Sequence, residues 1–495
     1  MTDRRAILTL DVGSSSARAR LYDERLRPFE AERPAVVTYG WQMDGGSMVI
    51  DPAALFDRVV SVLDQAVESS RALGVAIAAV ATTTFWHSLL GLNRAREPLT
   101  PLYGWGDGRA AGAAERLRRR LDADDYHRRT GCFLTSTYPA ARLAWLEETD
   151  PALFASVASW AAFGDYLESR LLGTHRTTFS IASASGLLDV RKLSWDGEVL
   201  ESLGLSESRL PELLDPQPAS GLGSEWSSRW PELRSAVWLP ALGDGACANV
   251  GSGAIGPARP GLTVGTSAAL RVLRRAGGED DPPASLWDYR LDSRYRIAGG
   301  ALSNGGNALA FLLDTFPQLS REEISVALAE KLPDSHGLTV LPALVAERGA
   351  DSAGAHAAVL SGLSLSSRPV QIAQTWLEAI ARRLADPFAA LEREFGPAEE
   401  VRASGGALQA VPGWVRTFAD VFERPVRLTA DPEATSRGAA VVAARTLGWI
   451  DSIEDAAPPV AGGFEPDADR HRTHRRAAAR EHELSRALRQ ISSAE

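Results

Sequence analysis

Lysine, cysteine and long apolar runs are all scarce in this chain of 495 residues. Its two lysines, Lys192 and Lys331, stand outside any Gly-Lys-Ser or Gly-Lys-Thr motif, which excludes a P-loop kinase. Its two cysteines, Cys132 and Cys247, cannot build a disulfide framework, and this scarcity favours the reducing cytoplasm. No stretch approaches the about 20 apolar residues of a membrane helix, and Asp11 stops the first apolar run too early for a signal peptide. We therefore expect a cytoplasmic protein with no membrane partner.

A positive net charge is absent as well. The chain carries 53 lysine and arginine residues against 63 acidic ones, a formal net charge of -10, which argues against a nucleic-acid partner bound by a general basic surface. The eight histidines are scattered without paired-ligand spacing, so a metal hydrolase is poorly supported. With 45% hydrophobic residues, the chain has ample material for large globular cores.

The stretch of residues 7–22 predicts a strand, a tight turn and a second strand. An apolar run ends at Asp11, and after the turn polar and apolar residues alternate around Arg18. The turn consists of Gly13, Ser14, Ser15 and Ser16. Its backbone N–H groups and hydroxyls are what phosphate oxygens need, and Asp11 is placed to hold a hydrated Mg²⁺ beside them. On its own, such a turn can equally be a simple connection between two strands.

A second copy of this pattern strengthens the phosphate-binding interpretation. Residues 261–273 repeat the order of apolar run, Val-Gly, hydroxyl residues and apolar run. The second turn consists of Gly265, Thr266 and Ser267. Two similar turns this far apart indicate a duplicated domain whose halves face each other across a cleft, with the phosphates of a nucleotide between the turns. The alternation of strands and helices in both halves favours α/β layers with mixed sheets, and we place the domains at residues 1–240 and 241–495.

A dinucleotide-binding fingerprint also occurs, at residues 251–256, as Gly-Ser-Gly-Ala-Ile-Gly. It follows a small-residue helical stretch instead of a strand, and Pro257 and Pro260 stand where its helix should run. That context rejects a Rossmann oxidoreductase.

From Leu8 to about Trp449 the chain resembles the FGGY family of carbohydrate kinases, within the actin/hexokinase-like superfamily. The segment from Asp11 to Arg18 resembles the family's first phosphate loop, and residues 265–267 resemble its second. Residues 239–251 are similar to the segment that carries the family's catalytic aspartate, which implies that role for Asp244. The residues similar to the family's adenosine-binding turn are Gly405, Gly406 and Ala407.

This resemblance implies an α/β fold of two duplicated actin-like, ribonuclease H-like domains, each a mixed sheet flanked by helices. It places the sugar site and the first phosphate loop in residues 1–240, and the catalytic aspartate, second phosphate loop and adenosine site in residues 241–495. ATP and Mg²⁺ are the implied cofactors, with Asp11 as the metal ligand. The chain becomes polar after Asp451, with histidines among arginines, and we expect an exposed helical tail there.

Asp244 also fits phosphoryl transfer on chemical grounds. Transfer to a hydroxyl needs an in-line arrangement, neutralisation of the phosphate charge and a group that accepts the hydroxyl proton. A carboxylate at a turn before a small-residue helix can accept that proton. The simpler interpretation of Asp244 is a helix N-cap, and the two roles are compatible.

Two further segments resemble the family's polyol-contacting segments. Trp86 and Trp105 can stack on the C–H face of a sugar, and His87 either contacts the substrate or satisfies buried backbone groups. Asp107 can accept hydrogen bonds from hydroxyls. Arg109 either orients Asp107 or meets a carboxylate of the substrate.

Several details, including the His87-Ser88 pair, resemble gluconate kinases within the family, whereas Gly164-Asp165 stands where those enzymes tend to carry Lys-Glu. We therefore expect ATP-dependent phosphorylation of a small sugar or sugar acid, with a gluconate-like substrate favoured. A ketopentose (xylulose or ribulose) or another polyol remains an alternative. An ATP-binding sugar sensor without kinase activity is the alternative of another class, although a sensor needs no proton acceptor such as Asp244. A homodimer is left open.

Overall fold

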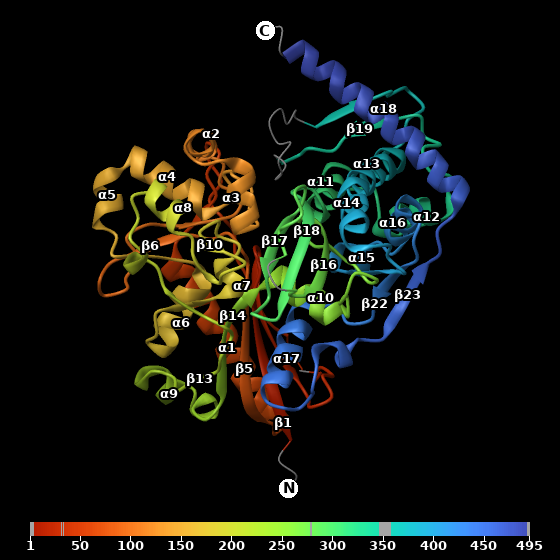
Figure 1. Cartoon of the computed structure of the whole chain (residues 1–495). Coiled ribbons are helices and arrows are strands. Elements are labelled where there is room, and N and C mark those ends of the chain that lie inside the picture. Colours follow the sequence, from red (N-terminus) through yellow and green to blue (C-terminus); the bar gives the residue numbers. More distant parts are fainter. Residues whose placement is uncertain (1–3, 31, 33, 278–279, 346–357, 493–495) are drawn as a thin grey trace. The chain divides into compact units, whose positions relative to one another are not determined.

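The computed structural model of this chain describes residues 4–30, 32, 34–277, 280–345 and 358–492. The chain forms two compact units, drawn in sequence colours in Figure 1. Unit 1 is formed from residues 1–251, 274–297 and 435–457, and unit 2 from residues 252–273, 298–434 and 458–495. This division differs from a single crossover near residue 240, because two later segments of the chain return to unit 1.

A six-stranded sheet in the order β13-β14-β5-β1-β2-β3 forms the centre of unit 1. β1 (Arg5–Val12) and β2 (Ser16–Tyr22) form the antiparallel hairpin that the sequence predicts. β5 (Ala76–Thr84) runs parallel to β1 and to β14 (Val237–Gly243). In this register Thr84 pairs with Val12 on one side and with Gly243 on the other. The residues that follow β1, β5 and β14 therefore meet at one edge of the sheet.

The helix α1 (Pro52–Leu73) covers this sheet and begins directly after Asp51. The side chain of Asp51 accepts a hydrogen bond from Ala53 N, and Pro52 occupies the first turn, a position that needs no N–H donor. One face of α1 shares a core with α6 (Phe163–Leu172) and with the strands. The α1 residues at helical spacing in this core include Leu55, Val59, Leu63 and Val67.

The other elements of unit 1 are short. They are β3 (Ala35–Thr38), β4 (Val49–Ile50), β6 (Leu90–Leu92), β7 (Leu102–Tyr103), α2 (Ala111–Arg120), α3 (Ala123–Thr130), α4 (Pro139–Thr149), α5 (Pro151–Ser156), β8 (Ser159–Ala161), β9 (Arg176–Thr178), α7 (Phe179–Ala182), β10 (Leu188–Asp189), β11 (Ser194–Trp195), α8 (Gly197–Ser202), β12 (Glu212–Leu214), β13 (Ala219–Ser220), α9 (Ser224–Arg229), α10 (Asp244–Ser252), β17 (Trp287–Arg290) and α17 (Ala434–Thr446), with 3₁₀ turns at Glu207–Arg209, Pro231–Leu233 and Ile453–Ala456.

The main strands of unit 2 belong to a seven-stranded sheet in the order β17-β18-β16-β15-β21-β22-β23. β15 (Gly261–Val264) and β16 (Ala268–Arg275) form an antiparallel hairpin around the second turn. β21 (Val401–Ser404) runs parallel to β15 and to β22 (Val426–Thr429). The order β16-β15-β21-β22 thus repeats the order β2-β1-β5-β14, and the predicted α/β fold of two duplicated, helix-flanked sheet domains is confirmed.

The remaining elements of the second half of the chain are two more strands of this sheet, β18 and β23, and elements outside it. They are β18 (Tyr295–Leu302), α11 (Gly306–Thr315), α12 (Arg321–Glu330), β19 (Thr339–Leu341), β20 (Val359–Ser361), α13 (Pro369–Arg383), α14 (Ala385–Phe395), α15 (Gly406–Ala410), α16 (Gly413–Phe422), β23 (Val460–Phe464) and α18 (Ala468–Ser492). Within the described ranges no helix is both long and apolar enough to cross a membrane.

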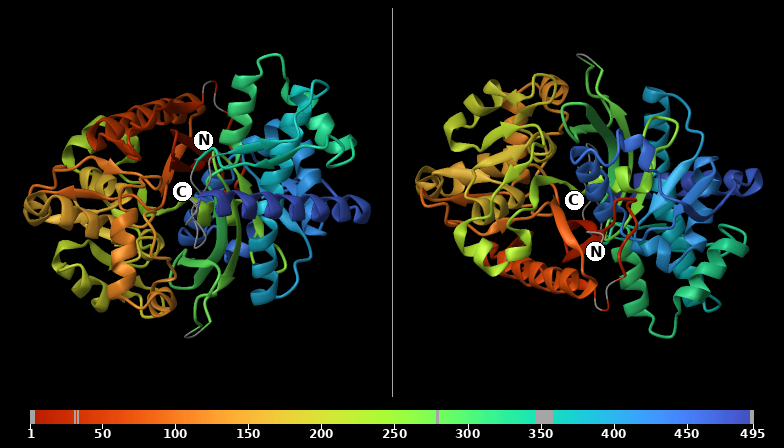
Figure 2. Two further views of the ribbon diagram at one scale, coloured as in Figure 1. Left: turned by 90° about the horizontal axis from the view of Figure 1, so that it is seen from above. Right: turned by 90° about the horizontal axis from the view of Figure 1, so that it is seen from below.

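The C-terminal helix α18, dark blue in Figures 1 and 2, has buried side chains up to Glu481 and none from residue 482 to residue 490, so the expectation of an exposed tail is corrected for its first half. The side chains of Arg470, His474 and Glu481 are buried. Arg470 Nε donates to Asp420 Oδ2 at 2.6 Å, and Arg382 Nη2 donates to Glu481 Oε1 at 2.6 Å. Burial lowers the pKa of His474 to about 3, so this imidazole is neutral. The inward face of α18 is polar because it pairs with buried charges, and it therefore lacks the apolar periodicity that marks a docked helix.

Candidate active site

The first predicted phosphate turn lies between β1 and β2. Gly13 N donates to Ser16 O at 3.0 Å, which closes the turn. Ser15 is exposed, and Ser14 is half-buried. Arg18 Nη2 donates to Ser16 Oγ at 2.8 Å, and Arg18 Nε lies 3.8 Å from Asp11 Oδ2. The turn therefore combines accessible backbone and hydroxyl groups with a guanidinium, the donor set that binds phosphate.

Asp11 fits a magnesium ligand by its chemistry. It is a hard oxygen donor that is 5% exposed at the end of β1. In the described part of the chain, no group of three or more histidine, cysteine, aspartate or glutamate side chains is arranged to hold a metal ion. A nucleotide-bound Mg²⁺ needs only one or two carboxylates, because phosphates and water supply its other ligands. One carboxylate at this position is sufficient for that kind of site.

Asp244 begins α10, directly after the last residue of β14. Gly243 N donates to Ser180 Oγ at 3.0 Å, while Trp86 Nε1 donates to Ser180 O at 2.9 Å. A Cβ atom on Gly243 would lie 1.9 Å from Trp86 Nε1, so only glycine fits there. Gly245 N donates to Asp244 Oδ1 at 2.7 Å. The backbone on both sides of the carboxylate is therefore held in place by side chains of unit 1.

The charges of the Asp11 and Asp244 carboxylates both raise the pKa of the same two buried side chains, Cys247 and Tyr39. Burial raises the pKa of Cys247, and the negative charges of Asp11 and Asp244 raise it further. Burial also raises the pKa of Tyr39, and both carboxylates add to that rise. The sheet register explains this proximity, because Val12 and Gly243 flank Thr84. The residues predicted as metal ligand and general base are thus brought to the same edge of the unit 1 sheet.

Arg109 and Asp107 form a bidentate ion pair. Arg109 Nη2 lies 2.6 Å from Asp107 Oδ2, and Arg109 Nε donates to Asp107 Oδ1 at 3.0 Å. Asp107 is 1% exposed and also accepts a hydrogen bond from Met48 N at 3.1 Å. The Arg109 side chain is 30% exposed, and its Cζ atom lies over the ring of Trp145, 4.7 Å from the ring centroid. Arg109 therefore orients Asp107, and its exposed edge is the part of the pair open to a ligand. Trp105, also predicted here, is half-buried.

His87 has an unusual backbone for its residue type, with φ at +63°, a left-handed conformation that costs free energy in residues with a side chain. Its Nδ1 lies 2.8 Å from Ala184 O. Because a carbonyl oxygen only accepts, Nδ1 carries the hydrogen in this contact; in the neutral form of the ring, Nε2 would then be the acceptor. Arg142 Nη1 donates to His87 O. Of the two roles expected for His87, substrate contact or partner of a buried backbone group, the Nδ1 contact with Ala184 O agrees with the second, and substrate contact through Nε2 stays a prediction.

An aromatic cluster that the sequence analysis missed surrounds His87. The His87 ring lies edge-on to Tyr138 and Tyr289, with centroid distances of 5.1 and 5.7 Å. The two tyrosine hydroxyls are 2.7 Å apart, and Trp287 stacks on Tyr289 at 4.5 Å. Trp287 and Tyr289 belong to β17, which follows Tyr138 by about 150 residues in the chain. In the sequence, the two aromatic residues alternate along a short strand, which is the only local pattern that marks them. No pattern in the neighbouring residues indicates that this strand belongs to unit 1.

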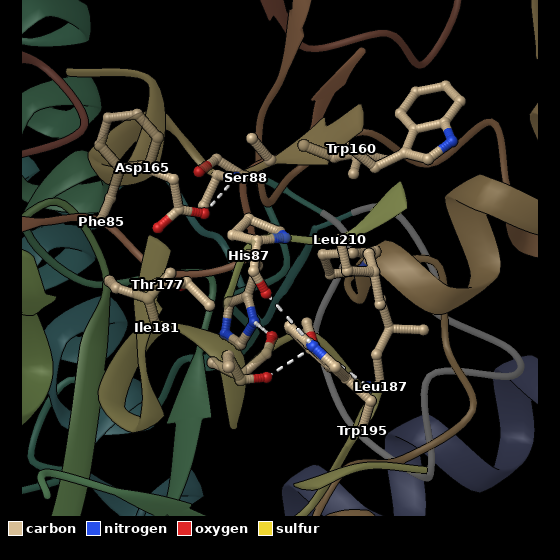
Figure 3. Close-up of a pocket in the computed structure, with 18 residues that line it drawn as sticks. Phe85, His87, Ser88, Trp160, Asp165, Thr177, Ile181, Leu187, Trp195 and Leu210 are labelled. Carbon is tan, nitrogen blue, oxygen red and sulfur yellow. Dashed lines mark hydrogen bonds between the residues drawn. The ribbon is translucent and has the colours of Figure 1, made fainter. Parts of the chain in front are cut away.

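Beside His87 lies a small pocket of about 40 Å³. Figure 3 shows Phe85 and Asp165 at one end of this pocket and Leu187 and Trp195 at the other, with His87 between them. Asp165 Oδ2 accepts a hydrogen bond from Ala162 N at 2.8 Å at the start of α6. Burial raises the pKa of Asp165 to about 7, against the opposing effect of the Ala162 N–H and Thr177. A pocket of this volume holds one or a few water molecules.

The replacement Asp165→Asn should flatten the pH dependence of stability. The pKa of Asp165 is about 7 in the folded protein, above its usual value of 3.8, so the folded state binds the proton more tightly than the unfolded chain does. The resulting stabilisation is complete below about pH 4 and is lost as the pH rises through about 7. Asparagine keeps an acceptor for Ala162 N and does not ionise, so its Tm at pH 8 should exceed that of wild type by a few degrees.

Thermal unfolding between pH 4 and pH 8 measures this effect. The matched control is Asp122→Asn, which changes an aspartate that caps α3 on the surface by accepting from Asp125 N. Parallel pH profiles of wild type and Asp165→Asn would contradict a buried carboxyl that titrates near neutrality.

The second predicted phosphate turn is built from backbone contacts in unit 2. Gly265 N donates to Ser267 O at 3.0 Å, and Gly306 N donates to Gly265 O at 2.8 Å. Gly405 has φ at +109°, and a Cβ atom there would lie 2.4 Å from Val264 O. A Cβ atom on Gly306 would lie 2.3 Å from Gly265 O and 3.1 Å from Ala407 Cβ. Three glycine segments thus meet at the starts of α11 and α15, where backbone N–H groups favour an anion.

Gly305 and Gly306 are the part of this arrangement that the sequence analysis missed. The predicted residues at 265–267 and 405–407 come together in unit 2 through the contacts of Val264, Gly405 and Gly306. The Asn-Gly-Gly-Asn sequence at residues 304–307 was the available signal. This sequence stands at the start of helix α11, where the backbone of Gly306 closely approaches the backbone of Gly265.

Two family models match most of this chain. Residues 6–227 match the N-terminal domain and residues 262–447 the C-terminal domain of the FGGY family of carbohydrate kinases. The chain is 24% identical over 473 residues to a gluconokinase of Bacillus subtilis (strain 168), covering 90% of this chain and 89% of that protein. It is 30% identical over 471 residues to a glycerol kinase of Aromatoleum aromaticum, covering 91% and 92%.

Solved structures share the fold. The crystal structure of a ligand-bound xylulose kinase from Lactobacillus acidophilus matches with a TM-score of 0.87 at 24% sequence identity, and the match covers 98% of both chains. The two domain matches together span most of the sequence. The chain belongs to the FGGY family of carbohydrate kinases, enzymes that transfer a phosphoryl group to a sugar hydroxyl.

Proposed function

We propose that this kinase uses Mg-ATP to phosphorylate a terminal hydroxyl of a small sugar acid, with gluconate as the favoured substrate and Asp244 as the general base. The observation that carries the proposal is the sheet register around Thr84, which pairs with Val12 and Gly243. It brings Asp11, His87 and Asp244 to one edge of the unit 1 sheet. A phosphate-binding turn, a polar ring and a carboxylate in one place supply what transfer to a hydroxyl requires.

The phosphates of ATP are bound in this proposal by backbone N–H groups and hydroxyls of both turns, with Arg18 as a charged partner. Gly405, Gly406 and Ala407 contact the adenosine. Mg²⁺ bound with the nucleotide supplies charge neutralisation on the phosphates, and Asp11 is the residue that would hold it. Asp244 orients the acceptor hydroxyl and takes its proton, a contribution commonly worth about 10²–10⁴ in rate.

The polyol contacts of the proposal come from unit 1. Trp105, which is half-buried, offers a ring face for C–H groups, and His87 offers Nε2 as a hydrogen-bond acceptor. The Trp86 ring is buried and its Nε1 donates to Ser180 O, so its part in the sugar site is to support the wall beside Gly243. The exposed edge of Arg109 can bind a carboxylate, which favours a sugar acid over a neutral polyol. The gluconokinase relative supports the same choice. A ketopentose or glycerol-like polyol is the alternative, supported by the xylulose kinase structure and the glycerol kinase relative.

Release of ADP from Mg-ATP across a substrate panel tests this proposal. The panel contains gluconate, xylulose, ribulose, glycerol, erythritol and several hexoses. We expect acceptor-dependent ADP release, strongest with gluconate. Turnover of xylulose or glycerol instead would keep the kinase and replace its substrate. ATP binding without turnover of any compound would favour the sensor that binds ATP and sugar without phosphorylation.

A further inference from the structure

The segment of residues 39–48, which we call the strap, contacts the first phosphate turn at its beginning. Tyr39 Oη donates to Gly13 O, and Tyr39 N donates to Ser15 O at 3.1 Å. Trp41 Nε1 donates to Ser14 O at 2.6 Å. Burial and then the charge of Asp11 raise the pKa of Tyr39, so its hydroxyl remains a donor. The strap therefore binds the carbonyls of three successive turn residues.

These contacts fix the direction of the N–H groups that the turn presents. In a trans peptide unit the C=O of one residue and the N–H of the next point in opposite directions within one plane. A donor on the Gly13 carbonyl therefore orients Ser14 N–H away from the strap, and a donor on the Ser14 carbonyl does the same for Ser15 N–H. Those N–H groups are the ones available to phosphate oxygens.

The end of the strap holds the segment of Asp107 and Arg109. Met48 N donates to Asp107 Oδ2 at 3.1 Å, and Gly104 N donates to Met48 O at 2.8 Å. Gly108 N donates to Gly46 O at 2.9 Å. The polyol segment and the phosphate turn are thus attached to the same ten-residue stretch of chain.

The Trp41 side chain contacts both the first phosphate turn, at Ser14 O, and the polyol segment, at Gly104. Its ring lies edge-on to Phe85 at 5.5 Å, the residue before Trp86 and His87. A Cβ atom on Gly104 would lie 2.9 Å from Trp41 Cζ3, so the backbone of the polyol segment packs directly on the indole. Movement of Gly104 or Phe85 on ligand binding would reach the Ser14 carbonyl through a single rigid ring.

We infer that Trp41 is a positioning residue that couples occupancy of the polyol segment to the orientation of the first phosphate turn. The identity of the two ligands rests on the proposed function, whereas the coupling rests on the contacts of the strap. A bound polyol that fixes Gly104 and Phe85 holds the indole against Ser14 O, and the turn then presents Ser15 N–H to phosphate. Without the polyol the turn is less well ordered for the nucleotide.

The test is the ratio of nucleotide affinities with and without polyol. The probes are Mg-AMP-PNP and gluconate, replaced by whichever panel compound is phosphorylated. In wild type we expect saturating polyol to tighten nucleotide binding about 5-fold or more, within the usual range of coupling between sites. Trp41→Phe keeps a ring on Phe85 and Gly104 but removes the Nε1–H donor, and its ratio should fall towards 1. By reciprocity, the nucleotide should change polyol affinity by the same factor.

The matched control is Trp226→Phe. The Trp226 indole is buried, whereas that of Trp41 is partly buried, and Trp226 Nε1 likewise donates to a backbone carbonyl, Arg170 O, at 2.9 Å. This variant should keep the wild-type ratio. General destabilisation by the tryptophan change would weaken both affinities without changing their ratio. A wild-type ratio in Trp41→Phe, an equal loss in Trp226→Phe, or no coupling in wild type would each overturn the inference. Failure of every panel compound as phosphoryl acceptor would instead count against the proposed function.

Discussion

Replacing Asp244 with asparagine should lower kcat by about 10²- to 10⁴-fold, the usual contribution of a positioned proton acceptor. Asparagine has nearly the same size, and its amide oxygen can still accept the hydrogen bond that Gly245 N donates at 2.7 Å. The amide cannot take a proton from the acceptor hydroxyl. The junction of β14 and α10 should therefore persist, because Ser180 and Trp86 hold Gly243 independently.

Two measurements separate loss of the base from loss of the site. The Kd of Mg-AMP-PNP should change little in Asp244→Asn, while turnover with the best panel compound falls. Asp64→Asn is the matched control in the same unit, because it makes the same chemical change in a surface ion pair with Arg229. It should leave kcat unchanged. Full turnover in Asp244→Asn would assign the proton acceptor to another group.

The parts of the site that the sequence predicted are those with a local signal. Each turn proposed to bind phosphate lies inside one hairpin, so an apolar run, a Val-Gly pair and hydroxyl residues within a short stretch were enough to predict the hairpin. Asp244 follows a buried strand and precedes a small-residue helix, which is also a local pattern. The duplication added long-range information, because the second turn indicated a second copy of the first sheet. The order β16-β15-β21-β22 beside β2-β1-β5-β14 bears this out.

The parts that were missed depend on contacts between distant residues. Tyr289 reaches Tyr138 because residues 274–297 return to unit 1, and no local pattern encodes that return. The sequence gives no signal for the contacts of the strap, since Tyr39 and Trp41 bind backbone carbonyls, which any donor could bind. Arg109 could be assigned to Asp107 only when the 2.6 Å ion pair was seen.

The C-terminal helix shows a different limit of sequence patterns. Arg470, His474 and Glu481 lie on the buried face of α18 and pair with charges of unit 2. Periodicity analysis counts apolar residues, so a face that is buried by ion pairs resembles a solvated one. A buried charge is tolerated only when its partner is present. The partners here, Asp420 and Arg382, lie on other helices, so the sequence of α18 alone does not show that its charges are paired.

Replacing Gly265 with valine should weaken binding of Mg-ATP by about 10- to 100-fold, the loss expected when one or two charged hydrogen bonds are blocked. Apart from Gly265 itself and its two neighbours in the chain, no described residue has an atom within 4 Å of a Cβ atom built on Gly265, and its φ is not in the left-handed region. The fold should therefore accept the side chain. The added methyl groups would occupy the space next to the turn's N–H groups, where a phosphate oxygen has to approach the backbone closely.

Two other glycines make this result specific. Gly462→Val in β23 is the matched control, because its Cβ also has no described atom within 4 Å and its φ is not left-handed, yet it lies in no predicted nucleotide segment. Gly405→Ala is the opposite case, because its Cβ would meet Val264 O at 2.4 Å with φ at +109°, so it should lower stability as well as affinity. Direct titration with Mg-AMP-PNP, combined with thermal unfolding, distinguishes the three variants. Unchanged affinity in a stably folded Gly265→Val protein would remove the second turn from the nucleotide site, since open space beside a glycine has functional meaning only if a ligand fills it.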